Sequence, residues 1–278
     1  MQEYSKQLTK GSGSNFYYSF LFLPKRKREA MYAVYAFCRH CDDIVDGTLS
    51  PDEAAAQLKY WQDELERCYQ GRAEHPIAVK LSETLKRFPI PKRYFEELIE
   101  GMEMDLWKTR YATFDELRQY CYRAASVVGL ICLEIFGYQS QKAKDYAENL
   151  GIAFQLTNIL RDLVPDLERG RIYLPLEDLE RFSYSEDDLS AHAHNDAFLK
   201  LMRFECLRAK GYFQRAEAAF PREDSRSLVA AEIMRAIYWR LLKAIERSPS
   251  DVFRGKVSLS KPHRLLLAFS IWLKSRLF

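Results

Sequence analysis

Glycine and proline are scarce in this chain, with 11 and 10 of these residues among 278. The sequence also lacks a Gly/Ser/Pro-rich linker, a low-complexity run and an internal repeat, so nothing marks a domain boundary. What remains is a series of long segments whose apolar residues recur with helical spacing. We therefore predict an all-α fold with a single domain over residues 1–278, in which residues 1–15 are flexible.

Several other features are missing. No apolar run approaches the ~20 residues of a membrane-spanning helix, and residues 1–23 lack the basic start and apolar centre of a secretory signal. The net charge of +3 is too balanced to indicate nucleic acid as a partner. The six cysteines lie mostly inside helical patterns, unlike the disulfide framework of a small secreted protein. These absences favour a cytoplasmic protein with reduced thiols.

The most informative segment is residues 155–166. Gln155, Asn158, Asp162 and Asp166 follow one another at spacings of three, four and four, so they share one face of a predicted helix. Apolar residues flank this polar row, and a buried unpaired charge is costly. A hard cation bound by oxygen ligands would account for the pattern. Pro165 disfavours helix at the preceding residue, which places Asp166 at a kink or just beyond the helix end.

A second acidic row ends a helix predicted over residues 25–46. Tyr35, Arg39, Asp42 and Asp46 are spaced by four, three and four residues, and Asp43 lies beside them. Aspartates this close repel one another unless they are solvated or share a cation. Acids are also disfavoured by the helix dipole at a C-terminus. A solvated helix end and a cation site both remain open at this point.

A calcium-binding loop is a further alternative for this region. Asp42, Asp46, Gly47 and Glu53 occupy positions one, five, six and twelve of an EF-hand pattern. Position three is Ile44, which offers no ligating oxygen. A single calcium loop also leaves the acids of residues 155–166 unexplained, so a non-catalytic helical or calcium-binding protein is the weaker hypothesis.

Four other segments carry two interpretations each. The aromatic residues 16–24 form either a packed N-terminal segment or a wall of an apolar cavity. Small residues at 124–126 and at 129, in a helix predicted over residues 115–138, allow close approach of another helix or of a ligand. The acidic residues of 92–107 favour a solvated face, with Asp105 as the one candidate ligand. The basic and apolar tail, residues 261–278, forms either a docked last helix or a helix on a membrane surface.

Two acidic rows on two helices could face each other across a cavity. Mg²⁺ takes one or two protein carboxylates and completes its shell with water and substrate phosphates. Arginines of the same segments, Arg39, Arg161 and Arg171, suit a diphosphate through bidentate contacts. Metal and arginine together favour departure of diphosphate, which leaves a carbocation in need of a dry pocket with aromatic faces. The aromatic candidates are Phe16, Tyr35, Tyr120, Tyr173 and Tyr238.

The two segments, YAFCRHCDDIVD at 35–46 and QLTNILRDLVPDLERGRIYLP at 155–175, resemble the two signatures of the squalene/phytoene synthase family. The resemblance implies an isoprenoid synthase fold, a helical bundle around a central cavity, and Mg²⁺-dependent head-to-head condensation of two prenyl diphosphates, with Mn²⁺ as a substitute metal. It implies metal ligation by Asp42, Asp46, Asn158, Asp162 and Asp166. It implies diphosphate or substrate binding by Phe16, Arg39, Gln155, Arg161, Arg171 and Tyr173, and a reaction site completed by Tyr35, Tyr120 and Tyr238.

Within the family, residues 12–24 most resemble the bacterial presqualene diphosphate synthases of hopanoid pathways. This resemblance predicts condensation of two farnesyl diphosphates to presqualene diphosphate for squalene and hopanoid synthesis. No dinucleotide-binding fingerprint is present, in agreement with a reaction that needs no NADPH. Phytoene or dehydrosqualene synthase of the carotenoid pathway is the alternative. A cytoplasmic location follows, with the tail as a candidate peripheral contact to the inner membrane face. Val164-Pro165 departs from the polar or acidic residues usual in relatives.

Overall fold

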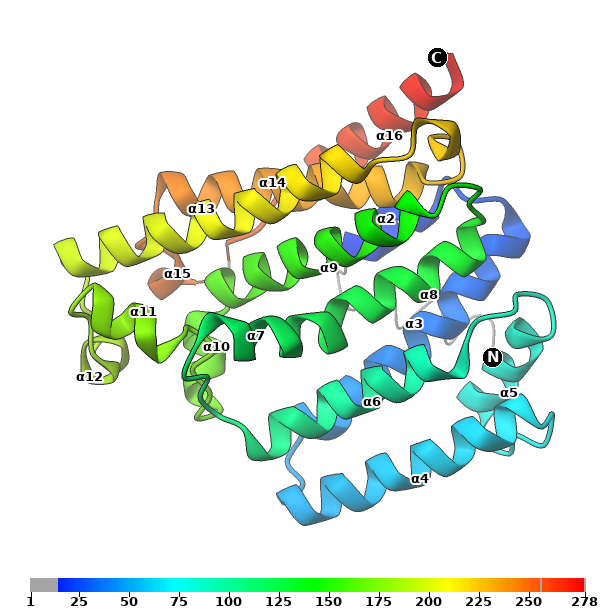
Figure 1. Ribbon diagram of the computed structural model, residues 1–278, viewed down its shortest axis with the longest axis horizontal. Coiled ribbons are helices and arrows are strands. Elements are labelled where there is room, and N and C mark those ends of the chain that lie inside the picture. The colour runs from blue at the N-terminus through cyan, green and yellow to red at the C-terminus, as the bar shows by residue number, and fades with distance from the viewer. Residues whose placement is uncertain (1–14, 256, 278) are drawn as a thin grey trace.

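The computed structural model describes residues 15–255 and 257–277, and across these ranges it contains helices and no β-strand (Figure 1). The longer helices are α3 (Lys25–Asp46), α4 (Pro51–Tyr69), α5 (Pro76–Leu85), α6 (Lys92–Trp107), α7 (Phe114–Cys121), α8 (Val127–Phe136), α9 (Lys142–Arg161), α13 (Asp196–Ala219), α14 (Val229–Arg247) and α16 (Lys261–Leu277). The shorter ones are α2 (Asn15–Phe20), α10 (Leu163–Glu168), α11 (Leu176–Arg181), α12 (Glu186–Ser190) and α15 (Asp251–Arg254). The prediction of an all-α fold is confirmed.

Helix α9 occupies the middle of the bundle (Figure 1) and contacts α8, α13 and α14. Its buried residues, among them Tyr146, Ile152 and Leu160, lie on several sides of the helix rather than along one stripe. A helix that is apolar on several sides has to be covered on several sides. The first part of the polar row, Gln155 and Asn158, is therefore carried into the interior by the helix that the bundle surrounds.

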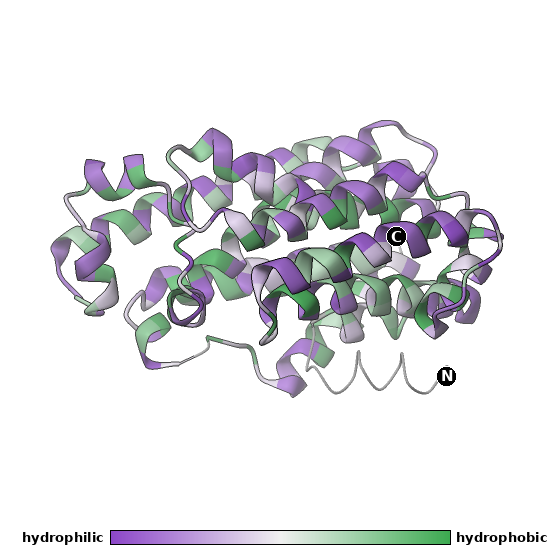
Figure 2. Cartoon of the chain, turned by 90° about the horizontal axis from the view of Figure 1, so that it is seen from below, coloured by the Kyte–Doolittle hydropathy of each residue, from purple (hydrophilic) through white to green (hydrophobic). Residues whose placement is uncertain are grey.

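The outer helices are amphipathic. In Figure 2 hydrophilic residues gather on their outward edges and hydrophobic residues on the sides that face neighbouring helices. Helix α4 starts as the sequence indicates, because Pro51 occupies its first position and Ser50 and Glu53 form a reciprocal capping box. Glu53 is thus used as a helix cap. Since Asp42 and Asp46 lie inside the uninterrupted helix α3, no calcium loop exists here and that alternative is wrong.

The helix predicted over residues 115–138 is divided in the structure. Helix α7 ends at Cys121, a π-helical turn follows over Tyr122–Ser126, and α8 continues from Val127. The turn packs against α9, where a Cβ added to Gly151 would lie 2.4 Å from the Cα of Ser126. The small residues therefore do permit a close helix approach, at a contact that admits only glycine.

Helices α2 and α16 pack against α14 and against each other. Asn15 is the first residue of α2, and residues 1–14 of the segment predicted to be flexible lie outside the described residues. Within the part of the chain that the structure describes, none of the helices has the length and apolar character required to span a bilayer.

Candidate active site

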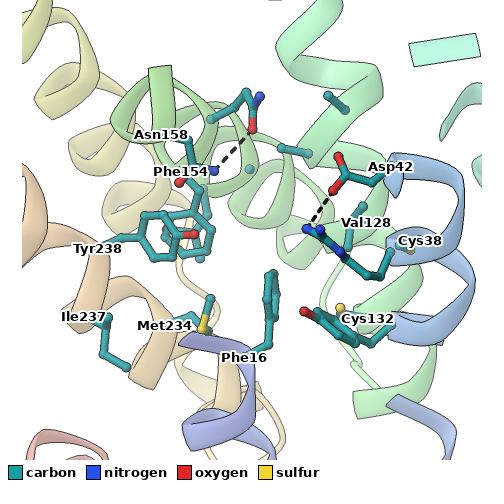
Figure 3. Close-up of a pocket in the computed structure, with 18 of the residues that line it drawn as sticks. Phe16, Cys38, Asp42, Val128, Cys132, Phe154, Asn158, Met234, Ile237 and Tyr238 are labelled. Atoms are coloured by element: carbon teal, nitrogen blue, oxygen red, sulfur yellow. Dashed lines mark hydrogen bonds and ion pairs between the residues drawn. The ribbon is translucent and has the colours of Figure 1, made fainter. Parts of the chain in front are cut away.

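A cavity of about 750 Å³ runs through the bundle, within the range of about 300–1,000 Å³ common for ligand sites (Figure 3). In Figure 1 helices α3, α6 and α9 all run toward the end of the bundle where α10 lies. Their C-terminal turns, which carry the acids, therefore gather at one end. The side chains singled out from the sequence all line this cavity: Phe16, Tyr35, Arg39, Asp42, Asp46, Tyr120, Gln155, Asn158, Arg161, Asp162, Asp166, Arg171, Tyr173 and Tyr238. The structure thus brings all of them to one cavity, whereas the role of each residue stays a prediction.

The last turns of α3 supply the first acidic motif. Arg39 Nη1 lies 3.0 Å from Asp42 Oδ2 and Arg39 Nη2 lies 2.5 Å from Asp43 Oδ1. Asp42 and Asp46, one helical turn apart, line the cavity, whereas Asp43 points about 100° away from Asp42 and does not line it. The predicted row is therefore a row in space, with Asp43 outside it.

The second acidic motif spans a break between two helices. Helix α9 ends at Arg161, Asp162 has φ −105° and ψ 25°, and α10 begins at Leu163. Pro165 occupies the third position of α10, where a backbone N–H would have no helical partner and proline is tolerated. The predicted kink exists, but it lies at Asp162, three residues before the proline, and Asp166 sits within a helical turn.

The geometry of this break holds the two aspartates in register. The backbone N–H of Asp166 donates to the carbonyl of Asp162 over 3.0 Å. Arg161 forms a two-pronged ion pair with Asp162, with Nε 2.8 Å from Oδ1 and Nη2 on Oδ2. Both carboxylates thereby reach the cavity that Asp42 and Asp46 line.

Arg171 connects the two motifs directly. Its backbone N–H donates to the carbonyl of Asp166 over 2.9 Å, while its guanidinium donates to Asp46 Oδ1 over 2.7 Å and to the carbonyl of Val45 over 2.9 Å. Arg171 is buried, with only 7% of its surface exposed. One arginine thus fixes the end of α3 against the loop that follows α10.

A further carboxylate, on α6, faces the same end of the cavity. Asp105 Oδ1 accepts a hydrogen bond from the Tyr173 hydroxyl at 2.7 Å, and Oδ2 accepts one from the Tyr120 hydroxyl at 2.9 Å. The two phenol rings stack with centroids 5.1 Å apart. Burial raises the pKa of Asp105 to about 6, against the opposing effect of the Tyr173 hydrogen bond. The acidic residue weighed in the sequence is therefore the anchor of two candidate site tyrosines.

The clustering of carboxylates shifts their titration. Burial, and after it the charge of Asp46, raises the pKa of Asp42 to about 6. Burial, and after it the charge of Asp162, raises the pKa of Asp166 to about 7. Neighbouring acids repel the charge of these carboxylates, so the site favours a cation that would relieve the repulsion.

The donors suit a hard divalent cation. All candidate ligands are oxygen atoms, and Asn158 Oδ1 is buried without a hydrogen-bond partner while its Nδ2 lies 3.4 Å from Gln155 Oε1 (Figure 3). Among the described residues no three carboxylate, histidine or cysteine side chains form a ready cage for one ion. A cation that takes one or two protein carboxylates and fills its shell from water and substrate phosphate fits this arrangement.

Beyond the acids the cavity is apolar and aromatic. The rings of Phe154 and Tyr238 stack with centroids 4.3 Å apart, and those of Phe16 and Tyr35 lie 5.9 Å apart. Small residues, Ala124, Ala125 and Gly129 among them, line the wall. The aromatic N-terminal segment therefore does contribute a cavity wall, through Phe16, Ser19 and Phe20.

Among the cavity residues that the sequence did not single out, Phe154 and Arg169 lie next to the acidic motifs. Phe154 precedes Gln155 and could have been found from the signature, had its ring been assigned to the pocket rather than to packing. Arg169 lines the cavity with its Nε 3.7 Å from Asp46 Oδ1. Its only signal was its place in a basic loop close to the acids.

Comparison with known families decides what this arrangement is. The model described as "Squalene/phytoene synthase" matches residues 9–263. The chain belongs to the squalene/phytoene synthase family. It is accordingly a prenyltransferase for head-to-head condensation of prenyl diphosphates, in a family that typically uses a divalent metal ion.

Three relatives of this squalene/phytoene synthase family member are phytoene synthases. It is 38% identical over 288 residues to a 15-cis-phytoene synthase of Synechocystis sp., covering 99% of this chain and 85% of that one. It is 40% identical over 268 residues to the 15-cis-phytoene synthase of Synechococcus elongatus, covering 91% and 86%. A phytoene synthase of Mycobacterium tuberculosis is 39% identical over 259 residues, covering 92% and 85%.

Solved structures confirm the isoprenoid synthase fold. A dehydrosqualene synthase aligns with a TM-score of 0.87 and 27% identity, covering 100% of this chain and 97% of that one. The squalene synthase HpnC from Alicyclobacillus acidocaldarius aligns with a TM-score of 0.79 and 32% identity, covering 88% and 93%. The prediction of the family is confirmed, while the relatives favour the phytoene synthase alternative over the presqualene diphosphate subtype chosen from residues 12–24.

Proposed function

We propose that this family member is a phytoene synthase, which condenses two C20 prenyl diphosphates head to head and releases both diphosphates. The observation that carries the proposal is the convergence of both aspartate motifs on one end of a single apolar cavity. The choice of subtype rests on the relatives, because three phytoene synthases are 38–40% identical to the chain over at least 91% of its length.

The acidic end of the cavity binds the diphosphate in this proposal. Asp42, Asp46, Asp162, Asp166 and the unpartnered amide oxygen of Asn158 would hold Mg²⁺, or Mn²⁺ in its place. When bound, the metal neutralises charge that develops on the departing diphosphate. The chain's own contribution is to hold these oxygens on α3, on α9 and on α10, with Arg171 linking the ends of α3 and α10.

Three arginines complete the anion site. Arg39, Arg161 and Arg171 line the same end of the cavity, and each already engages a carboxylate of its own motif or of the neighbouring one. A guanidinium presents several N–H donors, so it can keep a carboxylate and accept a diphosphate oxygen on its other edge. Orientation of the leaving group is the role proposed for them, with Tyr173 alongside.

The apolar part of the cavity protects the cation that remains after departure. Phe16, Tyr35, Phe154 and Tyr238 present ring faces or edges to the space between α2, α3, α9 and α14. Aromatic faces attract positive charge, and an apolar wall excludes water that would quench the cation. Tyr120, held by its hydrogen bond to Asp105, lines the same cavity.

A second candidate has its own support. The 32% identity to the squalene synthase HpnC and the TM-score of 0.87 with a dehydrosqualene synthase favour two C15 substrates. In that case the first product is presqualene diphosphate, as residues 12–24 led us to expect from the sequence. NADPH is not expected for either product.

Product analysis distinguishes the candidates. The purified protein is incubated with C15 or C20 prenyl diphosphate and Mg²⁺, with and without NADPH, and the extracts are separated by chromatography. We expect phytoene from the C20 substrate as the dominant product, unaffected by NADPH. Presqualene diphosphate or dehydrosqualene as the dominant product would transfer the assignment to the second candidate, and diphosphate release at background with both substrates would overturn both.

A further inference from the structure

Helix α16 carries an apolar face that stays exposed among the described residues, 15–255 and 257–277. Leu265, Leu266, Phe269 and Leu273 are 47%, 68%, 49% and 41% exposed. At about 100° per residue these four side chains fall within an arc of about 100° on one side of the helix. They are four of the nine large hydrophobic side chains that are exposed in the described part of the chain. Apolar surface concentrated in this way marks an interaction site.

The side of the same helix next to this arc is packed. Ala268 is fully buried, and the ring of Trp272 lies 5.5 Å from that of Phe22. Helix α16 contacts α14 and α2 along this side (Figure 1). The exposed leucines are thus held on a supported helix, and their exposure follows from how that helix is docked.

The charges of α16 identify the kind of partner. The helix exposes Lys261, Lys274 and Arg276 and contains no acidic residue, although the chain as a whole has 42 basic and 39 acidic residues. A helix with an apolar arc and exclusively cationic charges is typical of segments that lie in the interface of an anionic bilayer. A second copy of the chain would bring two cationic helices together, which disfavours self-association through this face.

A neighbouring element adds further positive charge. Phe22, whose ring contacts Trp272, precedes four consecutive basic residues, 25–28, at the start of α3. Lys25 and Arg26 of this run are exposed, and Glu29, 4.0 Å from Lys25, is the acid on the same turn. Cationic side chains beside the packed edge of α16 extend the surface that would attract anionic headgroups.

We propose that α16 docks the protein on an anionic lipid bilayer, with Leu265, Leu266, Phe269 and Leu273 inserted among the headgroups. The segment just before the helix, Val257, Ser258 and Leu259, lines the cavity, and so does Arg264 on its first turn. The docked face therefore lies beside a wall of the cavity that is proposed to bind the prenyl chains. This inference does not depend on which prenyl chain length the enzyme uses.

Vesicle flotation of the full chain tests the proposal. Vesicles of phosphatidylcholine alone are compared with vesicles that contain about 30% phosphatidylglycerol, at low and high salt. We expect binding to the anionic vesicles that weakens as salt rises, because screening reduces the cationic contribution. The variant with Leu266→Glu and Phe269→Glu should bind at least about tenfold more weakly, because two apolar anchors become anionic.

A matched control separates this face from general surface effects. Leu199 and Leu207 on α13 are 38% and 55% exposed, so Leu199→Glu with Leu207→Glu likewise replaces two exposed apolar side chains by glutamate elsewhere. This control should bind vesicles within about twofold of the unsubstituted protein. Circular dichroism and prenyl transfer in detergent should be unchanged in both variants, since none of the four residues lines the cavity.

Three results would overturn the proposal. One is the absence of binding to anionic vesicles at low salt, and another is an equal loss of binding in the α13 control. The third is a dimer in light scattering that the α16 variant dissociates, together with no partition onto vesicles, which would make the face a contact between copies.

Discussion

The two acidic motifs carry similar residues on differently built backbones. On α3 the acids extend a continuous helix, and Asp42 keeps 42% of its side chain exposed. On α9 and α10 the acids flank a break, and Asp162 keeps 18% exposed beside Arg161 at 12%. One motif is an accessible row at the mouth of the cavity, and the other is held inside by its own arginine. The ligands proposed for a shared metal–diphosphate group would thus come from one open and one enclosed wall.

Removal of an acid from either wall should have the largest effect. Asp42→Ala and Asp162→Ala are each expected to lower kcat/KM by at least about 10³-fold while helical circular dichroism is retained, because metal–diphosphate binding in the transition state is lost. The matched control is Asp43→Ala, next to Asp42 but outside the cavity, with a change of less than about threefold. Equal losses for Asp42 and Asp43 would show that charge on α3, and not a site, is what matters.

The connection between the walls comes next. Arg171→Lys retains the charge but cannot reach Asp46 and the carbonyl of Val45 together, so we expect a loss of about 1–3 kcal/mol in the free energy of unfolding. Activity should fall by roughly 100-fold as the motifs lose their fixed separation. Urea unfolding and steady-state kinetics measure the two effects. Arg169→Lys, in a more exposed pair with Asp46, should alter the free energy of unfolding by less than about 0.5 kcal/mol. A wild-type unfolding midpoint for Arg171→Lys would contradict the bridging role.

The raised pKa values predict a pH dependence that differs between the walls. Metal binds the ionised carboxylates, and the pKa is about 6 for Asp42 and about 7 for Asp166. Both groups are protonated well below pH 6 and ionised above pH 8, so Mg²⁺ affinity should rise with pH across this window and binding should release protons. Calorimetry in buffers of different ionisation enthalpy reports that release. Asp166→Asn should abolish the upper part of the dependence, and an unchanged profile in this variant would remove Asp166 from the metal site.

The smallest effect is expected at Pro165, in the second wall. Pro165→Ala leaves the first turn of α10 with helical geometry, so stability should change by no more than about 1 kcal/mol and activity by less than about twofold. Thermal unfolding and steady-state turnover are sufficient to check this. A loss of activity as large as that of Asp162→Ala would mean that the proline positions Asp166.

The helices and the motif residues could be predicted because both depend on the spacing of residues that are close together in the sequence. Periodic apolar residues located α3 and α9, and spacings of three and four placed Asp42 with Asp46 and Asn158 with Asp162. The break at Asp162 could not be located this way, because proline is compatible with the first turn of α10 as well as with a helix end.

Features that depend on contacts between distant segments were beyond local patterns. The π-helical turn at Tyr122–Ser126 packs closely against Gly151 of α9. Asp105 is held in the site by hydrogen bonds from Tyr120 and Tyr173. The subtype suggested by residues 12–24 is a comparable case. The length of chain that a cavity accepts is set by walls from α2, α3, α8, α9 and α14 together, which no single segment encodes.

Diffraction from crystals grown with Mn²⁺ and inorganic pyrophosphate tests the shared site most directly, because anomalous scattering locates the ions. The account predicts Mn²⁺ between the walls, within about 2.0–2.3 Å of oxygens from both Asp42 or Asp46 and Asp162 or Asp166, with pyrophosphate bridging them. Ions bound at one motif alone, or on the outer side of α3 at Asp43, would contradict it.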